Sequence, residues 1–201
     1  MASKRRAIGV PPDGQVAGLM EAIERYGTPA LRTYHYDVSE EMWRYWQTMR
    51  RKRAAEVVAL LRRRSGRYLV HTKRFYPEGT YRLPSGGIKP GERLMEALHR
   101  EVAEETSLTV CVEAFLATVA HRFHLHGEEV AFTSYVFLLR EVSGTLHTAD
   151  EGEEITGFRE IPLAEVVALA DELEGLPPGW QEWGRFRASV HRVVGEVMGE
   201  E

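Results

Sequence analysis

The sequence predicts an α/β fold, an α/β/α sandwich with a mixed β-sheet, together with an N-terminal helical extension and a C-terminal helix. Strand-like segments stand on both sides of one internal helical segment, and two helical segments follow the last strand. This order of elements is typical of helices packed on the faces of a sheet. With 201 residues, of which 43% are hydrophobic, the chain can bury one substantial core.

The first 53 residues are predicted to form a tail and a helical extension. Residues 1–13 are polar, basic and closed by "PPDG", which predicts a disordered tail. In residues 14–53, "QVAGLMEAIERYG" has helical spacing, and Ser39 can cap "EEMWRYWQTMRRKR". An apolar stripe on this second helix predicts a docking face, against its own domain or against a second subunit. The stripe recurs at helical spacing and consists of Met42, Tyr45, Trp46 and Met49.

Residues 54–201 are predicted to form the main domain. "EVVALLRR" and "RYLVHTKR" are separated by a turn and predict a hairpin, as do the longer runs "TVCVEAFLATVAHRF" and "EEVAFTSYVFLLREV". "ITGFREI" predicts a last short strand. "PLAEVVALADELEGL" and "GWQEWGRFRASVHRVVGEVM" then predict helices.

Charge divides the chain into two unlike halves. Residues 1–100 carry 20 Lys and Arg against 10 Asp and Glu, so the totals of 26 and 30 leave 6 against 20 for the rest. This asymmetry favours an anionic partner or attraction between the halves, and a solvated surface is the alternative. The single cysteine, Cys111, excludes an internal disulfide, and no apolar run is long enough to span a bilayer. We therefore expect a cytoplasmic protein with no membrane partner.

Three carboxylates crowd the helix that is predicted within "GGIKPGERLMEALHREVAEETSL", residues 86–108. The apolar positions of this helix repeat every four residues, whereas Glu101, Glu104 and Glu105 can converge on one point beside them. Like charges at this spacing destabilise a helix, and a divalent cation removes that penalty. Oxygen ligands suit Mg²⁺, with Mn²⁺ as a substitute. A solvated acidic face is the alternative.

The same segment resembles the Nudix box, G-x5-E-x7-R-E-U-x-E-E-x-G-U, in which U is a bulky aliphatic residue. Gly86, Glu92 and the run from Arg100 to Leu108 match it, except that Ser107 stands where the family has glycine. The resemblance implies a Nudix hydrolase domain over residues 54–201. It also implies cleavage of the diphosphate linkage of a nucleoside diphosphate derivative, by metal-assisted attack of water on phosphorus.

The resemblance further implies a set of site residues. Glu101, Glu104 and Glu105 are expected to ligate the metal, with the Gly86 carbonyl as a further ligand. The expected catalytic residues are Glu104 and Glu154, together with Arg100. We expect Arg100 and Glu92 to order the junction between loop and helix rather than to touch substrate. The general base is either a glutamate of the box or one from the later loop that holds Glu151, Glu153 and Glu154.

Glu154 is our choice for the loop carboxylate, and a solvated acidic loop is the alternative. Cations near the box could contact the phosphates of the substrate, and the predicted ones are Lys73, Arg74 and Arg82. The stretch "HRFHLH" holds His121, His124 and His126, for which we considered a transition-metal site, a substrate groove and ordinary polar surface.

Two other functions stay open at the level of sequence. The basic clusters at 50–53 and 62–64 keep an RNA 5'-end pyrophosphohydrolase in view, although no nucleic-acid-binding motif accompanies them and nucleic acid is not favoured. A non-catalytic nucleotide-sensing Nudix domain is the other alternative. Because a catalytic core needs fewer than 201 residues, we expect residues 14–53 to build a homodimer interface. The sequence does not identify which diphosphate is the substrate.

Overall fold

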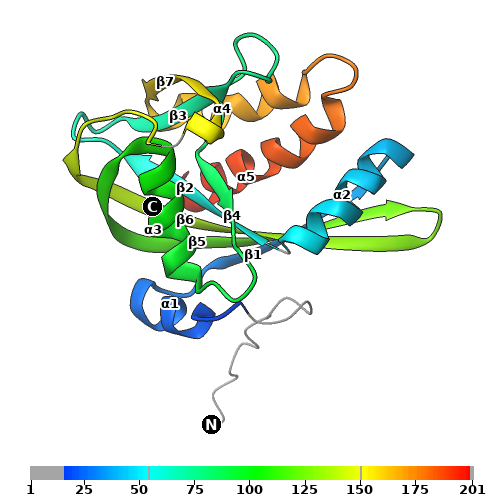
Figure 1. The fold of residues 1–201 in the computed structure, drawn as a ribbon, viewed down its shortest axis with the longest axis horizontal. Coiled ribbons are helices and arrows are strands. Elements are labelled where there is room, and N and C mark those ends of the chain that lie inside the picture. The colour runs from blue at the N-terminus through cyan, green and yellow to red at the C-terminus, as the bar shows by residue number, and fades with distance from the viewer. Residues whose placement is uncertain (1–15, 54, 150, 200–201) are drawn as a thin grey trace.

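The computed structural model describes residues 16–53, 55–149 and 151–199, and Figure 1 shows their arrangement. The elements run in the order α1 (Leu19–Tyr26), β1 (Ala30–Asp37), α2 (Glu40–Lys52), β2 (Ala55–Arg62), β3 (Tyr68–Lys73), β4 (Ser85–Gly87), α3 (Leu94–Thr106), β5 (Leu108–Leu125), β6 (Glu128–Gly144), η1 (Glu151–Glu153), β7 (Ile155–Ile161), α4 (Leu163–Glu174) and α5 (Gln181–Gly199). The predicted α/β class is confirmed.

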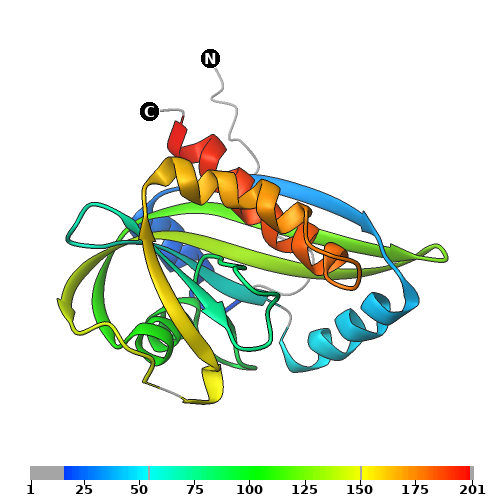
Figure 2. The same cartoon turned by 90° about the horizontal axis from the view of Figure 1, so that it is seen from above.

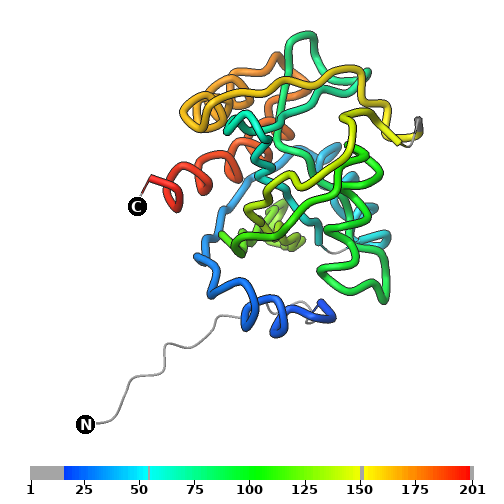
Figure 3. Tube along the Cα trace, turned by 90° about the vertical axis from the view of Figure 1, so that its left-hand side faces the viewer, coloured from blue at the N-terminus to red at the C-terminus, as the bar shows by residue number. Residues whose placement is uncertain are grey.

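A mixed sheet separates two layers of helices, as the sandwich prediction requires. Its strand order is β1-β5-β6-β2-β3-β7, with β4 paired to β2. Side chains of α1 and α3 share one buried cluster with one face of the sheet, and α4 and α5 share another with the opposite face. Figures 2 and 3 show α4 and α5 lying together on their side of the sheet.

The N-terminal extension differs from the expectation, because it is not wholly helical. Its two helices form as predicted, but between them lies β1, which pairs in parallel with β5 from Ala30↔Ala117 to Asp37↔His124. Segment 14–53 therefore adds an edge strand to the sheet of the main domain. The predicted tail, residues 1–13, lies outside the described residues. The proposed division into domains stays a prediction.

The apolar stripe of α2 packs on the protein's own core. The Ser39 side chain accepts a hydrogen bond from the Met42 N–H, as the capping prediction required. Trp46 is 3% exposed, and its ring lies 4.1 Å from Phe123 and 4.7 Å from Phe186, measured between centroids. Of the two docking faces considered, the structure shows the one against the chain's own domain.

The two predicted hairpins form to different extents. The β5–β6 hairpin is long and continuous apart from three register shifts. β2 and β3 pair only at Arg62↔Tyr68, because the same edge of β2 pairs with β4 at residues 56–58. β3 pairs along its length with β7. The segment before β7 lies close to α3.

The basic first half and the acidic second half are joined by ion pairs within the chain. Arg62 binds Glu113 at 2.6 Å, and Arg63 binds Glu141 at 2.7 Å. The cluster at 50–53 lies at the end of α2, where positive charge stabilises the helix dipole. Attraction between the halves thus accounts for much of the charge asymmetry. Among the described residues, none of the helices combines the length and the apolar character that a membrane span requires.

Candidate active site

The helix α3 carries the predicted carboxylates and packs by its apolar stripe. Leu94, Leu98 and Val102 are buried in the cluster that α3 shares with the sheet. The helix stops at Ser107, which adopts the left-handed conformation with φ 56°. A non-glycine residue pays about 1–2 kcal/mol for this conformation, and Ser107 Oγ lies 3.1 Å from His147 Nε2. The departure from the glycine of the box therefore leaves the turn intact.

A glycine on β4 makes room for the first carboxylate of the site. A Cβ atom added at Gly86 would lie 1.8 Å from Glu101 Cδ, far inside any allowed contact. β4 is held there by antiparallel pairing with β2, in the register Val57↔Gly86. The Glu101 side chain consequently lies directly on the backbone of β4, in a space that only glycine at position 86 leaves open.

Carboxylate oxygens from α3 and from η1 converge at this point. One oxygen each from Glu101, Glu104 and Glu153 lie within 4.8 Å of one another. Glu105 lies further inside, 1% exposed, and its Oε1 has no hydrogen-bond partner. Lys73 Nζ stands 2.6 Å from Glu153 Oε2 and 3.4 Å from Glu105 Oε1. The site therefore contains four acidic groups and one ammonium group in close contact.

Burial and the neighbouring carboxylates raise the pKa of Glu101 and the pKa of Glu105. Burial raises the pKa of Glu105 to about 7, and the neighbouring carboxylates add to the rise. Burial also raises the pKa of Glu101, although its hydrogen bond from Arg100 opposes the change. A cation bound between the carboxylates would reverse both shifts, because it favours their ionised forms.

Arg100 orders the acidic side chains. Its Nε and Nη2 donate to the two oxygens of Glu92, at 2.6 and 2.9 Å. Its Nη1 donates to Glu101 and Glu104, both at 2.8 Å. Nη2 also donates to the Gly87 carbonyl on β4, at 2.9 Å. The guanidinium thus joins the loop before α3, the helix and β4, at the junction where we expected it to act.

The loop carboxylate in the site is Glu153 rather than Glu154. Glu154 is exposed, has a positive φ of 53°, and accepts a hydrogen bond through its carbonyl from the Arg74 N–H. Neighbouring residues in this segment point in different directions, and the sequence does not reveal which one faces α3. The structure thus places Glu153, and not the predicted Glu154, among the carboxylates of the cluster.

The three predicted phosphate contacts occupy three different environments. Lys73 lies within the acidic cluster, and Arg74 is exposed beside it. Arg82 is only 4% exposed, and its guanidinium donates to Tyr76, to the Leu83 carbonyl and to Ser85. The predicted substrate contact Arg82 therefore directs these donors into the protein rather than toward the surface.

Two neighbours of the site were missed at the level of sequence. Arg53 lies against Gly87, where an added Cβ would be 2.1 Å from Arg53 Cδ. His71 is fully buried, with Nδ1 3.9 Å from Glu105 Oε1 and with no hydrogen bond at either ring nitrogen. Burial lowers the pKa of His71 well below its ordinary value. Side chains alternate in direction along β3, so His71 and Lys73 lie on one face. This alternation could have identified His71 from the sequence.

The histidine stretch in β5 divides between core and surface. His121 is fully buried, and its ring nitrogens lie 3.1 Å from the Tyr36 hydroxyl and 3.0 Å from Ser134 Oγ. His126 is exposed in the turn that follows the strand. His124 is half-buried, and its Nε2 lies 2.9 Å from His35 Nδ1.

Comparison with known proteins identifies the family. The family model described as the NUDIX domain matches residues 51–181, well over half of the chain. The chain therefore belongs to the NUDIX family, and the match includes every residue of the acidic cluster.

Curated relatives match this chain over part of their own length. It is 34% identical over 125 residues to the putative mutator protein MutT4 of Mycobacterium tuberculosis (strain CDC 1551 / Oshkosh), covering 60% of this chain and 45% of the relative. It is 37% identical over 75 residues to the 8-oxo-dGDP phosphatase NUDT18 of Homo sapiens, covering 37% of this chain and 21% of the relative. The chain thus spans less than half the length of these relatives.

Solved structures with a related chain path are more distant. A MutT protein from Methanosarcina mazei Go1 aligns with a TM-score of 0.41 and 20% identity, over 69% of this chain and 94% of that one. An Ap4A hydrolase of C. elegans aligns with a TM-score of 0.46 and 17% identity, over 74% of this chain and 99% of that one.

Proposed function

We propose that this protein hydrolyses the diphosphate linkage of a nucleoside diphosphate derivative and that it uses Mg²⁺, with Mn²⁺ as a substitute. The observation that carries the proposal is the convergence of Glu101, Glu104 and Glu153 oxygens within 4.8 Å beside Gly86. Membership of the NUDIX family supports the reaction type. Acidic side chains at this density need a counter-charge, and a diphosphate substrate needs a cation that it can share with the protein.

The donor atoms of the site fit a hard divalent cation. The side-chain donors are all carboxylate oxygens, the ligand type that Mg²⁺ prefers, and one of them, Glu105 Oε1, is buried without a hydrogen bond, 3.4 Å from Lys73 Nζ. Glu101, Glu104 and Glu105 would hold the cation, with Glu153 and the Gly86 carbonyl as further ligands or neighbours. When bound, the cation would make water more acidic and stabilise negative charge on the phosphate oxygens.

The chain's own residues supply positioning and proton transfer. Arg100 holds Glu101 and Glu104 in fixed orientations through the hydrogen bonds described above. We assign to Glu153 the role of general base that the sequence suggested for its neighbour. Since Lys73 binds Glu153 Oε2, the proton of the attacking water would go to Oε1. The ion pair with Lys73 also holds the Glu153 side chain in place.

Cations beside the acidic cluster would bind the rest of the diphosphate. Arg53 lies over Gly87, next to the glycine that borders Glu101, and Arg74 is exposed where β3 ends. Guanidinium groups suit phosphate because they donate two parallel hydrogen bonds. We propose Arg53 and Arg74 as phosphate contacts in place of Arg82.

A substrate screen tests this proposal. The full chain is incubated with nucleoside diphosphates, oxidised purine nucleoside diphosphates, nucleoside diphosphate sugars and dinucleoside polyphosphates, each with Mg²⁺ or Mn²⁺, and the phosphate products are identified. The name of the NUDT18 relative makes 8-oxo-dGDP the first compound to test. We expect turnover that a chelator abolishes and that Glu101→Gln reduces.

The screen also separates the alternatives. Binding without turnover of any diphosphate would favour a nucleotide sensor. Turnover confined to RNA 5' ends, with affinity falling steeply as salt rises, would favour an RNA-end hydrolase. The ion pairs that occupy Arg62 and Arg63 give that alternative little support.

A homodimer and a cytoplasmic location remain predictions from the sequence. The apolar stripe of α2 gives little support to a dimer interface, since its Trp46 is buried in the chain's own core. Exposed Tyr45 on the same helix is the part of the stripe that a second copy could still contact. Light scattering of the full chain at micromolar concentration tests the dimer, and a monomer would exclude it.

A further inference from the structure

Three potential metal ligands lie on three neighbouring strands, remote in the sequence from the acidic cluster. His35 belongs to β1, His124 to β5 and Glu129 to β6, and these strands are adjacent in the sheet. His124 and Glu129 are a direct cross-strand pair, and His35 stands two positions before Asp37, the residue opposite His124. The three side chains share one face because positions that alternate along a strand point the same way.

The ligand atoms of this triad are already close together. His35 Nδ1 lies 2.9 Å from His124 Nε2, and His124 Nε2 lies 3.9 Å from Glu129 Oε2. One atom from each residue falls within 4.8 Å of the other two. In a tetrahedral site with bonds of about 2.0–2.1 Å, ligand atoms stand roughly 3.3 Å apart, a value that lies between the two distances from His124 Nε2 to its neighbours.

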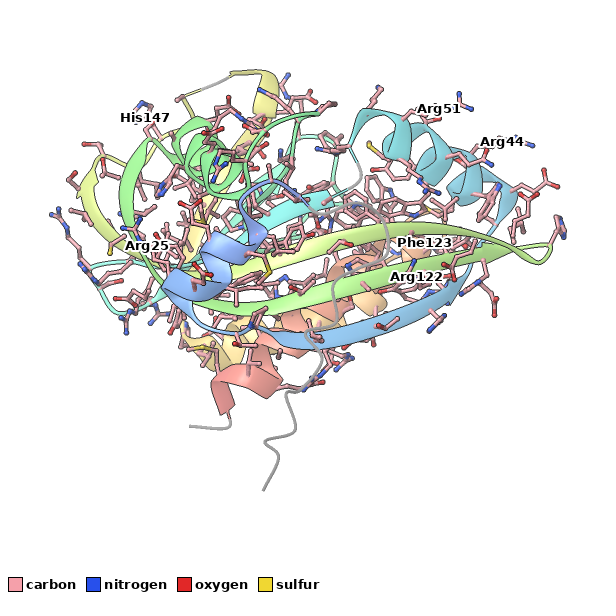
Figure 4. All side chains as sticks on the ribbon, turned by 90° about the horizontal axis from the view of Figure 1, so that it is seen from below. Arg25, Arg44, Arg51, Arg122, Phe123 and His147 are labelled. Carbon is pink, nitrogen blue, oxygen red and sulfur yellow. The ribbon has the colours of Figure 1, made fainter. Side chains whose placement is uncertain are left out.

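The surroundings hold the triad in place. The neighbours of the two histidines in the chain, Tyr36 and Phe123, are buried on the opposite face, with ring centroids 5.0 Å apart. The His124 carbonyl accepts a hydrogen bond from the Val38 N–H, which continues the pairing of β1 with β5. Figure 4 labels Phe123 and its neighbour Arg122 on β5, at the end of the molecule where α2 lies.

A fourth side chain orients the carboxylate. Arg122 Nη1 donates to Glu129 Oε1 at 3.1 Å, while Glu129 Oε2 faces His124. Carboxylates that bind metals are commonly fixed by a hydrogen bond of this kind on the oxygen that does not ligate. In the absence of an ion the two imidazoles share one hydrogen bond, in which one ring donates and the other accepts. An ion would engage the lone pairs of both.

We propose that His35 Nδ1, His124 Nε2 and Glu129 Oε2 form a binding site for a borderline divalent transition metal such as Zn²⁺. Two imidazoles and one carboxylate suit Zn²⁺, whereas Mg²⁺ prefers oxygen alone. The partial exposure of all three residues leaves a fourth position open to water. Because β1 is the edge strand, the bound ion ties β1 to the β5–β6 hairpin and stabilises the fold.

The test measures Zn²⁺ binding by the full, untagged chain, using isothermal titration calorimetry in excess Mg²⁺. The Glu101→Gln background removes the acidic cluster as a competing site. We expect one Zn²⁺ per chain and a rise in the unfolding temperature. His35→Ala and His124→Ala should each weaken binding by at least about 10–100-fold, the loss that even an outer partner of a ligand causes. The visible spectrum of bound Co²⁺ should report histidine ligation and disappear in both variants.

The matched control is His126→Ala, which removes an exposed histidine from the adjoining turn and should leave Zn²⁺ affinity unchanged. Glu129→Gln is the second variant. It keeps the size of the side chain, whereas a histidine substitution could loosen β1. Wild-type affinity in His35→Ala and His124→Ala would overturn the proposal, as would an equal loss in His126→Ala. Absence of Zn²⁺ binding by the unsubstituted triad would also overturn it.

Discussion

Glu101 occupies the space that a side chain at Gly86 would fill, with its Cδ atom 1.8 Å from the position of an added Cβ. Gly86→Ala should therefore displace the carboxylate while leaving the pairing of β4 with β2 in place. We expect turnover to fall by on the order of 10²-fold or more, because misplacement of about 1 Å has that effect on a reacting group. The measurement is the rate of diphosphate hydrolysis, with circular dichroism as the check on folding.

Gly157→Ala is the control for this substitution, since its added Cβ would meet neighbours no closer than 3.4 Å. Near-native rates in Gly86→Ala would show that the carboxylate position is not required.

Glu153 and Glu154 are adjacent in the chain but occupy different environments. Glu153→Gln should lower turnover by about 10²–10⁴-fold, the usual contribution of a general base. Glu154→Gln should have little effect, because Glu154 is exposed outside the cluster. Rates measured at saturating Mg²⁺ distinguish loss of a base from loss of a ligand. A larger fall in turnover for Glu154→Gln than for Glu153→Gln would contradict the assignment.

Trp46 and Tyr45 test whether α2 belongs to the core. Trp46 is 3% exposed and packs on Phe123, so Trp46→Ala should lower the free energy of unfolding by about 3–5 kcal/mol. Tyr45 is 38% exposed, and Tyr45→Ala should cost no more than about 0.5 kcal/mol. Denaturant unfolding of both variants measures the two losses of unfolding free energy. Equal losses would contradict the packing of α2 on the core.

His121 should make stability depend on pH. Burial lowers the pKa of His121 to about 3, against about 6.5 in an unfolded chain. Between these values only the unfolded state binds the proton, so this contribution to stability is complete above about pH 6.5 and is lost as pH falls. The loss approaches about 1.4 kcal/mol per pH unit. His121→Gln should flatten the decline of the unfolding free energy between pH 6.5 and pH 4, and an unchanged slope would contradict this.

The sequence predicted the fold class because hydrophobic periodicity marks most of its elements. The strand β1 was not predicted, because Leu31 at its start is exposed and the run "YHYD" mixes aromatic and polar residues. Tyr34, Tyr36 and Val38 at every second position were the signal that was available. The short pairing of β2 with β3 could not be predicted either, since strand pairing depends on partners distant in the sequence, here β4.

The sequence predicted the acidic cluster on α3 because a single helix carries its residues at fixed spacing. The choice between Glu153 and Glu154 depended on a non-helical segment, where neighbouring side chains have no regular direction. Arg82 looked like a surface cation by its type, but its donors satisfy buried acceptors on its own strand connection. Contacts that join separate elements, such as Arg53 on Gly87, leave no local pattern to recognise.

Mn²⁺ binding tests the acidic site without requiring a known substrate. The electron paramagnetic resonance signal of the free ion measures this binding. The full chain should bind Mn²⁺ and release it to excess Mg²⁺. Glu101→Gln and Glu104→Gln should each weaken binding by at least about tenfold, because each removes an oxygen ligand. Glu154→Gln should bind as the unsubstituted chain does. Unaltered Mn²⁺ affinity in both Glu101→Gln and Glu104→Gln would contradict the assignment of this cluster as the metal site of a diphosphate hydrolase.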